Sequence, residues 1–189
     1  MRYSEDHKAQ THQRIINEAS ARFRRDGIGA TGLQPLMKSL GLTHGGFYAH
    51  FKSKDELVEK SLRQAADSLS AHCNALFEKA DNPLAAFVDH YLSAAHRASP
   101  AEGCPLPTMS AELGQRGQAS MITDEVIKNR LKSIQRGLSV AHTNAPELST
   151  VMLSALVGAL VLSRSALDPE LSDRILEDTR EWLKQQTKS

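Results

Sequence analysis

The sequence predicts an all-α protein: a small three-helix unit at the N-terminus followed by a larger helical body. Apolar residues recur at helical spacing along most of the 189 residues, and no stretch shows the period-two alternation with hairpin turns that is typical of strands. A hydrophobic share of 40% and a charged share of 24% are ordinary for a globular protein that buries a sizeable core. The two cysteines, Cys73 and Cys104, are therefore expected to be free thiols.

The N-terminal elements follow from apolar spacing and from turn residues. A first helix is predicted over 11–23, and a short second helix over 33–40, opened by a capping box of Thr31 and Gln34. After a compact Gly-Leu-Thr turn, a third short helix is predicted over 44–51. Two short helices joined by such a turn have the geometry that presents one helix to the major groove of DNA, although many unrelated helical proteins share this spacing.

The body begins with a long amphipathic helix that runs from a capping box of Ser53 and Glu56 toward Phe77. Further helices are predicted over 83–95, after Pro107, over 127–141, after Pro146, and after Pro169 with Asp168 as its cap. Charge is uneven along the chain, since residues 1–60 carry a net charge of +3 and the remainder −2. The basic side is thus the N-terminus.

The stretch 27–57, and most of all GLTHGGFYAHFKSKDEL over 41–57, closely resembles the DNA-binding head of the TetR/AcrR family of regulators. The resemblance covers about the first sixty residues. It implies a helix-turn-helix DNA-binding domain over 1–53, a ligand-binding and dimerisation domain over 54–189, and a homodimer. It further implies a transcriptional regulator, commonly a repressor, that a small-molecule inducer or an electrophile releases from a double-stranded DNA operator.

In that family, a turn hydroxyl, the opening of the recognition helix, its central tyrosine and a following lysine touch DNA. The matching positions here are Thr43, Gly45, Gly46, Tyr48 and Lys54. Hydroxyls, backbone N–H groups and an ammonium all donate to phosphate oxygens, so these contacts position the head without reading sequence. The whole set expected at DNA is Thr31, Gln34, Thr43, His44, Gly45, Gly46, Tyr48, His50, Lys52 and Lys54.

Two positions depart from the family pattern. His44 stands where many members carry lysine, and Gly46 adds a second glycine beside Gly45, so base reading falls to Gln34, His44, His50 or DNA shape. Other roles stay open. If His50 does not contact phosphate, it is a packed or solvated histidine. If Lys52 and Lys54 do not contact phosphate, they are a solvated pair. The head's small core is predicted at Leu36, Leu40, Phe47 and Phe51.

In the body, the candidates for effector binding or sensing are Phe87, Tyr91, Cys104, Met109 and Leu113, and ordinary core packing is the alternative for each. Cys104 lies in a constrained loop before a short helix, where the helix dipole favours a thiolate. The residues at 103–104 and 110–113 also resemble a TetR branch that responds to electrophiles and oxidants. Cys104 is therefore a candidate sensing thiol or, alternatively, a buried structural cysteine.

A dimer surface is expected over about 146–186, because residues 151–161 form a helix that is apolar almost all round. The resemblance implies a four-helix bundle across a two-fold axis, with Gly158 allowing close approach. The alternative is a single core helix of a monomer.

Other chemistries lack a matching pattern. GIGATG over 27–32 spells the dinucleotide-binding fingerprint, but a helix precedes it where a strand is required. No catalytic set, cofactor motif or zinc spacing stands out, and His90 and His96, six apart on one predicted helix, do not share a face. A cytoplasmic protein without a membrane partner is expected. The alternatives to a regulator are a helical small-molecule-binding protein or enzyme with a vestigial head, and a scaffolding dimer.

Overall fold

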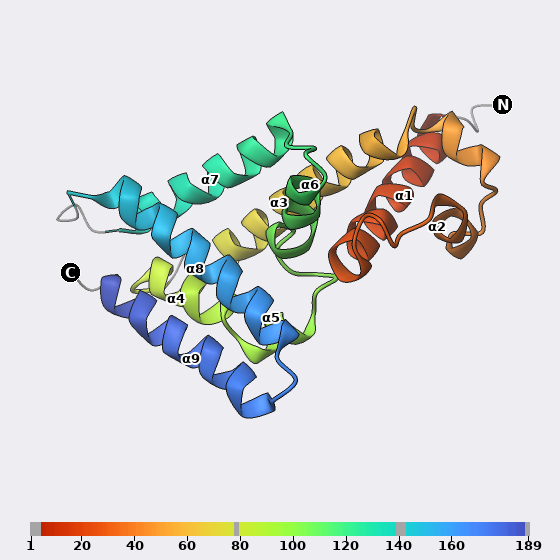
Figure 1. The fold of residues 1–189 in the computed structure, drawn as a ribbon. Coiled ribbons are helices and arrows are strands. Elements are labelled where there is room, and N and C mark those ends of the chain that lie inside the picture. Colours follow the sequence, from red (N-terminus) through yellow and green to blue (C-terminus); the bar gives the residue numbers. More distant parts are fainter. Residues whose placement is uncertain (1–4, 78–79, 139–142, 188–189) are drawn as a thin grey trace. The chain divides into compact units, whose positions relative to one another are not determined.

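The computed structural model describes residues 5–77, 80–138 and 143–187, and every regular element within these ranges is helical. Nine α-helices, one 3₁₀ helix and one π-helix follow one another along this part of the chain (Figure 1). The predicted all-α class is therefore confirmed.

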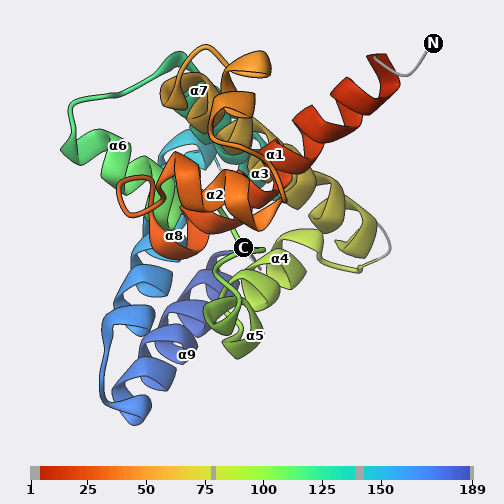
Figure 2. The same ribbon diagram turned by 90° about the vertical axis from the view of Figure 1, so that its right-hand side faces the viewer.

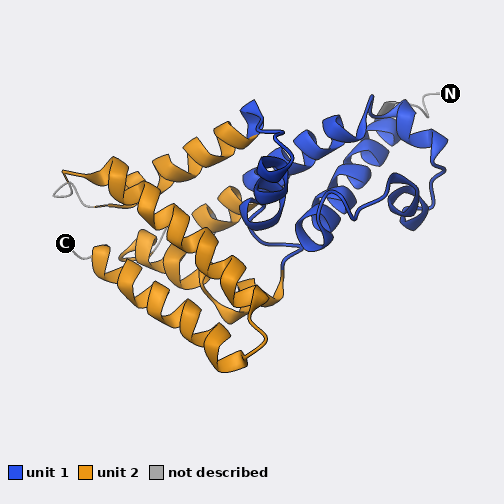
Figure 3. Ribbon diagram, viewed as in Figure 1, with its two compact units in different colours: residues 1–68, 100–122 blue, residues 69–99, 123–189 orange. Residues whose placement is uncertain are grey.

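The chain divides into two compact units (Figure 3). The first comprises residues 1–68 and 100–122, and the second comprises residues 69–99 and 123–189. The first unit thus contains the predicted head together with a segment that comes from the middle of the sequence. The expected division of function at residues 53 and 54 stays a prediction.

The first unit is built around α1 (Glu5–Asp26), whose buried stripe holds the head together. Its other elements are α2 (Leu33–Ser39), the 3₁₀ helix η1 (Gly45–Ala49), the first part of α3 (Lys54–Phe77), the π-helix η2 (Leu106–Ser110) and α6 (Ala111–Gln115). Ile15 and Phe23 of α1 are fully buried, as are Leu36 and Phe47. Phe51 is 2% exposed, so three of the four predicted core residues are confirmed, while Leu40 is half-buried at the end of α2.

The segment predicted as a third α-helix over 44–51 is a five-residue 3₁₀ helix. Gly45 and Gly46 open it, and glycine loses more backbone entropy in a helix than any other residue. A tighter, shorter turn is the form that such a weak helix sequence adopts when the buried ring of Phe47 fixes it to the core.

The two predicted capping boxes have different outcomes. The one at Thr31 and Gln34 is wrong: Gly32 caps α2, and the Thr31 hydroxyl instead donates to the carbonyl of Gly27 at 2.8 Å. At the start of α3 the Glu56 N–H donates to Ser53 Oγ at 3.1 Å, as predicted. The Glu56 carboxylate then accepts the N–H of Lys52, one residue before the expected partner.

The second unit contains the last part of α3, α4 (Pro83–Tyr91), α5 (Ala94–Ala98), nearly all of α7 (Met121–Gly137), α8 (Ala145–Ser165) and α9 (Pro169–Gln186). The single helix predicted over 83–95 is broken, because the Ser93 side chain accepts the His96 N–H and caps a new helix. This break stacks the rings of His90 and His96 at 6.1 Å, which corrects the expectation that they lie on different faces. The predicted end of α7 at Ala141 falls outside the described residues.

Helices α8 and α9 lie side by side, as both Figure 1 and Figure 2 show, and α4 packs against α9. The predicted cap is confirmed: the Asp168 side chain accepts the Glu170 N–H at 3.0 Å and opens α9. By length and composition α8 could cross a membrane, a test that the core helix of a globular protein also passes.

Candidate nucleic-acid interface

A sharp turn separates α2 from η1, and Gly41 makes it possible. Its φ of +73° is in the left-handed region that glycine adopts without steric cost. The Leu42 N–H donates to the Met37 carbonyl at 2.9 Å, and the Gly41 N–H donates to the Lys38 carbonyl at 3.0 Å. This pair of bonds is the Schellman arrangement that ends a helix and redirects the chain.

The start of η1 is braced by Thr43. Its hydroxyl oxygen accepts the Gly46 N–H at 3.2 Å, so the side chain that was predicted to meet phosphate also caps the turn. A Cβ on Gly46 would lie 3.3 Å from this oxygen, whereas a Cβ on Gly45 would meet nothing within 4 Å. Glycine at 46 therefore serves close packing inside the head, and Gly45 leaves its backbone open to approach from outside.

The two aromatic residues of η1 have opposite environments. Phe47 is fully buried, whereas Tyr48 is 61% exposed, and their rings meet edge to face at 5.2 Å. The exposed ring of His44 lies edge-on to Tyr48 at 5.9 Å. A large exposed aromatic fixed by a buried neighbour is the arrangement of a contact residue, because burial of Phe47 holds Tyr48 on the surface.

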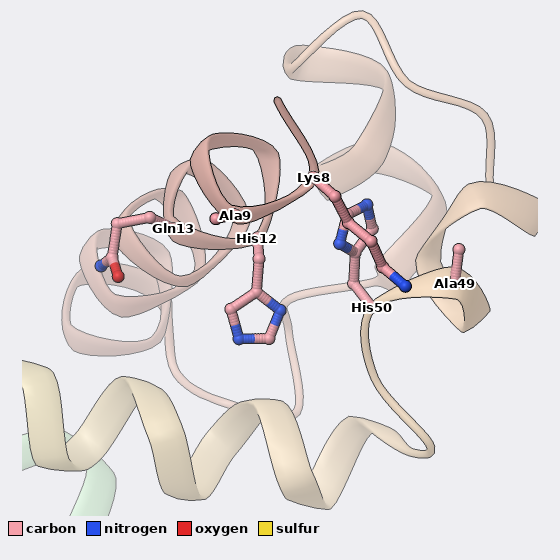
Figure 4. A pocket seen from close by; sticks show the side chains of 6 residues that line it. All are labelled: Lys8, Ala9, His12, Gln13, Ala49 and His50. Carbon is pink, nitrogen blue, oxygen red and sulfur yellow. The ribbon is translucent and has the colours of Figure 1, made fainter. Parts of the chain in front are cut away.

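Beside η1 is an open hollow of about 500 Å³ that α1 and the end of η1 line. Figure 4 shows its lining residues: Lys8, Ala9, His12, Gln13, Ala49 and His50. The His12 ring stacks on Phe51 at 4.4 Å and lies 6.0 Å from the His50 ring. Burial, and then the positive charge of nearby lysines, lowers the pKa of His12, and burial lowers that of His50. This hollow offers hydrogen-bond donors to an anion.

Sequence reasoning missed Lys8 and His12 at this place. His12 precedes the buried Ile15 and Ile16 by three and four residues, a spacing that puts it on the same side of α1. That periodicity was the available signal.

Lys52 and Lys54, the two lysines after η1, differ in exposure and in hydrogen bonding. Lys52 is exposed, and its backbone N–H donates to Glu56. The Lys54 ammonium is half-buried and donates to the Ile28 carbonyl at 2.6 Å. Burial, and then the charge of Arg116, lowers the pKa of Lys54. Lys54 thus ties the start of α3 to the loop after α1, besides any role at phosphate.

The same loop is held from the other side by Glu112 of α6. Its carboxylate accepts the Ile28 N–H at 2.5 Å and the Gly29 N–H at 2.7 Å, and Arg116 pairs with it. Arg24 of α1 donates to the Gly103 carbonyl at 2.9 Å. The segment 100–122 is therefore bonded both to α1 and to the loop that follows α1.

Most of the residues predicted to contact DNA are exposed, and they lie between residues 34 and 54. Gln34, Thr43, His44, Gly45, Tyr48 and Lys52 are exposed, and Gly46, His50 and Lys54 are partly so. Thr31 is the exception, since it is 5% exposed and its hydroxyl is engaged with Gly27. We correct that assignment: Thr31 braces the loop.

The residues predicted to bind or sense an effector fall into separate units. Phe87 and Tyr91 belong to the second unit, where their rings lie 5.6 Å apart and are 7% and 1% exposed. Cys104, Met109 and Leu113 belong to the first unit and are also buried. Cys104 precedes the five-residue π-helix η2, which runs directly into α6.

The head and body define the class: a helical protein with an N-terminal helix-turn-helix whose recognition turn presents polar and aromatic groups. Residues 15–60 match the profile of bacterial regulatory proteins of the tetR family.

Two transcriptional repressors are similar to this chain in sequence. The transcriptional repressor KstR2 of Mycolicibacterium smegmatis is 32% identical over 76 residues, which is 40% of this chain and 37% of the relative. The match thus spans little more than a third of that relative's length. The repressor DhaR of Mycobacterium sp. strain GP1 is 22% identical over 87% of both chains.

Solved structures extend the likeness in fold. A TetR-family regulator from Cytophaga hutchinsonii superposes with a TM-score of 0.79 at 18% identity, covering 97% of this chain and 98% of that one. The reduced form of E. coli NemR gives 0.76 at 17% identity, covering 93% and 96%.

Proposed function

We propose that this chain is a DNA-binding transcriptional repressor that acts as a dimer in the cytoplasm and leaves its operator when an effector binds or a thiol is modified. The observation that carries the proposal is the recognition turn, where the exposed Tyr48 is fixed beside the fully buried Phe47. The relatives KstR2 and DhaR are both transcriptional repressors, which supports repression over activation for this chain.

Contacts with phosphate would supply most of the affinity. The Tyr48 hydroxyl, the backbone at Gly45 and the ammonium of Lys52 are exposed donors on one short stretch. The hollow at His12 and His50 adds further donors next to it. These groups position the head, and base reading falls to Gln34, His44 and His50 or to DNA shape. The exposed side chains of Gln34 and His44 support this assignment.

A dimer through α8 and α9 is supported by apolar side chains that these helices leave exposed. Val151 and Leu162 of α8 are 52% and 59% exposed, and Trp182 of α9 is 47% exposed. When a second copy of the chain packs against these side chains, apolar area is removed from water, which stabilises the dimer. Two heads in a symmetric dimer would then read half-sites roughly 34 Å apart, one turn of DNA.

For effector release, two routes have support in the described residues. Phe87 and Tyr91 form a buried aromatic pair in the second unit. Cys104 lies next to Gly103, whose carbonyl is bonded to Arg24, so modification of a thiol that is 3% exposed would disturb a segment tied to α1. Mass spectrometry after mild electrophile treatment tests the second route: release from DNA with Cys104 unmodified would eliminate it.

Selection from a random duplex library tests the proposed function even though the operator sequence is unknown. We expect enrichment of a near-palindrome whose half-sites are about one helical turn apart. The Tyr48→Ala variant, carried through the same selection, should enrich nothing. Enrichment of no sequence by the folded wild-type protein would leave a ligand-binding protein with a vestigial head, or a scaffolding dimer, as the better explanation.

A further inference from the structure

Helix α7 carries a buried positive charge at Arg130. This residue is 8% exposed and lies in the second unit, far along the sequence from the head. Transfer of a guanidinium from water into a protein interior is unfavourable unless an anion or several hydrogen bonds compensate it. The partner of Arg130 is therefore informative.

The neighbour of this guanidinium is an aromatic ring. The guanidinium carbon of Arg130 lies 5.4 Å from the centre of the Phe87 ring of α4, a cation–π contact. Among the residues that the structure describes, no carboxylate lies within ion-pair distance of Arg130. A ring face attracts a cation, but it leaves the net charge uncompensated.

Two other arginines of the second unit, Arg97 and Arg180, do have carboxylate partners. Arg97 pairs with Asp173 at 2.7 Å, and Arg180 lies 3.9 Å from Asp89. These two side chains are more exposed than Arg130, and yet they have carboxylates. Of these three arginines, Arg130 is the most buried, and it has no carboxylate partner within the described ranges.

The surroundings of Arg130 suit an organic ligand. Phe87 packs against Tyr91 with ring centres 5.6 Å apart, and both side chains are buried. The start of α4 lies close to the end of α7, since a Cβ on Gly137 would lie 2.8 Å from the Cβ of Leu84. A cation over one aromatic ring, which in turn packs on a second, matches a small acid with a flat apolar part. The guanidinium binds a carboxylate with two parallel hydrogen bonds, and the aromatic side chains pack on the rest.

We propose that Arg130 is the anchor of an effector site in the body, and that the effector is an organic carboxylate with an aromatic or similarly flat apolar group. The inference that this ligand controls DNA binding rests on the proposed function; the binding site itself does not. Phe87 and Tyr91 supply apolar contact, and Arg130 supplies the selectivity for an anion over its neutral analogue.

Benzoate and benzamide are a matched pair of probes, since they share shape and differ in charge. In thermal unfolding without DNA, benzoate should raise the Tm of the wild-type protein by mass action, and benzamide should not. Arg130→Met should weaken benzoate binding by about 10- to 100-fold, the usual value of a hydrogen bond to a charged partner. Arg136→Met is the control, because Arg136 is exposed on the same helix.

Equal stabilisation by benzamide, an unchanged benzoate effect in Arg130→Met, or no benzoate effect on the wild type would each overturn the proposal. Circular dichroism checks that Arg130→Met folds. If it does not, Arg130→Lys, which retains the charge but not the two-pronged geometry, should still bind benzoate about tenfold more weakly.

Anisotropy on an operator duplex then separates the two claims. Benzoate binding to a protein that never binds DNA would support the site and contradict the proposed function. A protein that binds DNA but not benzoate would support the proposed function and contradict the effector site.

Discussion

Glu112 is the residue of α6 whose removal should most directly loosen the head. Its carboxylate accepts two backbone N–H groups, from Ile28 and Gly29, just before α2 begins. A hydrogen bond to a charged group contributes about 1.5–3 kcal/mol, and the lower value applies because this side chain is partly exposed. Glu112→Ala, which removes both bonds, should therefore cost about 3 kcal/mol locally, and Glu112→Gln, which keeps one accepting oxygen, about half of that.

Amide hydrogen exchange measures this opening residue by residue. Since 1.4 kcal/mol is a factor of ten, exchange at Ile28 and Gly29 should accelerate about 100-fold in Glu112→Ala and about tenfold in Glu112→Gln. Glu59→Gln, at an exposed carboxylate of α3, is the control and should change neither amide. Unchanged protection of both amides in Glu112→Ala would refute the argument that this carboxylate holds the loop.

Three further predictions concern the recognition turn and the body. Tyr48→Ala should abolish DNA binding while changing the unfolding free energy by less than about 0.5 kcal/mol, whereas Phe47→Ala should lower that free energy by about 3–5 kcal/mol in urea unfolding. Lys52→Met should weaken DNA binding on all sequences and reduce the slope of log affinity against log salt by about 1, measured by anisotropy. Burial holds the pKa of His96 at about 4, below its ordinary 6.5, so the neutral ring stabilises the fold above pH 6.5 and that contribution is lost as pH falls toward 4. It amounts to about 3 kcal/mol, and urea unfolding followed by Trp182 fluorescence should show a weaker pH dependence in His96→Gln.

The sequence predicts well what local rules decide. Apolar spacing locates α1, α2, α3 and α9, and the caps at Ser53 and Asp168 are as expected because capping depends on residues three or fewer positions away. The exposed side of the recognition turn follows from Phe47, since burying one ring leaves the next residue on the surface.

Local rules fail where two possibilities compete within a few residues. Thr31 satisfies the capping-box pattern, yet its hydroxyl finds the Gly27 carbonyl four residues earlier. Ser93 interrupts an apolar pattern that continues smoothly to Ala95, so periodicity alone predicts one helix where there are two. In both cases a side chain that can bond the backbone decides the outcome.

Long-range contacts were beyond sequence reasoning. The bond from Ile28 to Glu112 joins residues 84 apart, and no periodicity encodes such a pairing. The same holds for Arg130 beside Phe87, because a charged residue in an amphipathic helix is expected to face water until its partner helix is known.

Fluorescence anisotropy tests the central claim most directly: the protein is titrated into a labelled duplex from upstream of its own gene and into a scrambled duplex, at two salt concentrations. We predict preferential binding to the native duplex, weaker at the higher salt, and loss of this binding in Tyr48→Ala. Two results together would contradict the assignment of the recognition turn as the DNA-binding surface: equal binding to both duplexes, and no change of that binding in Tyr48→Ala.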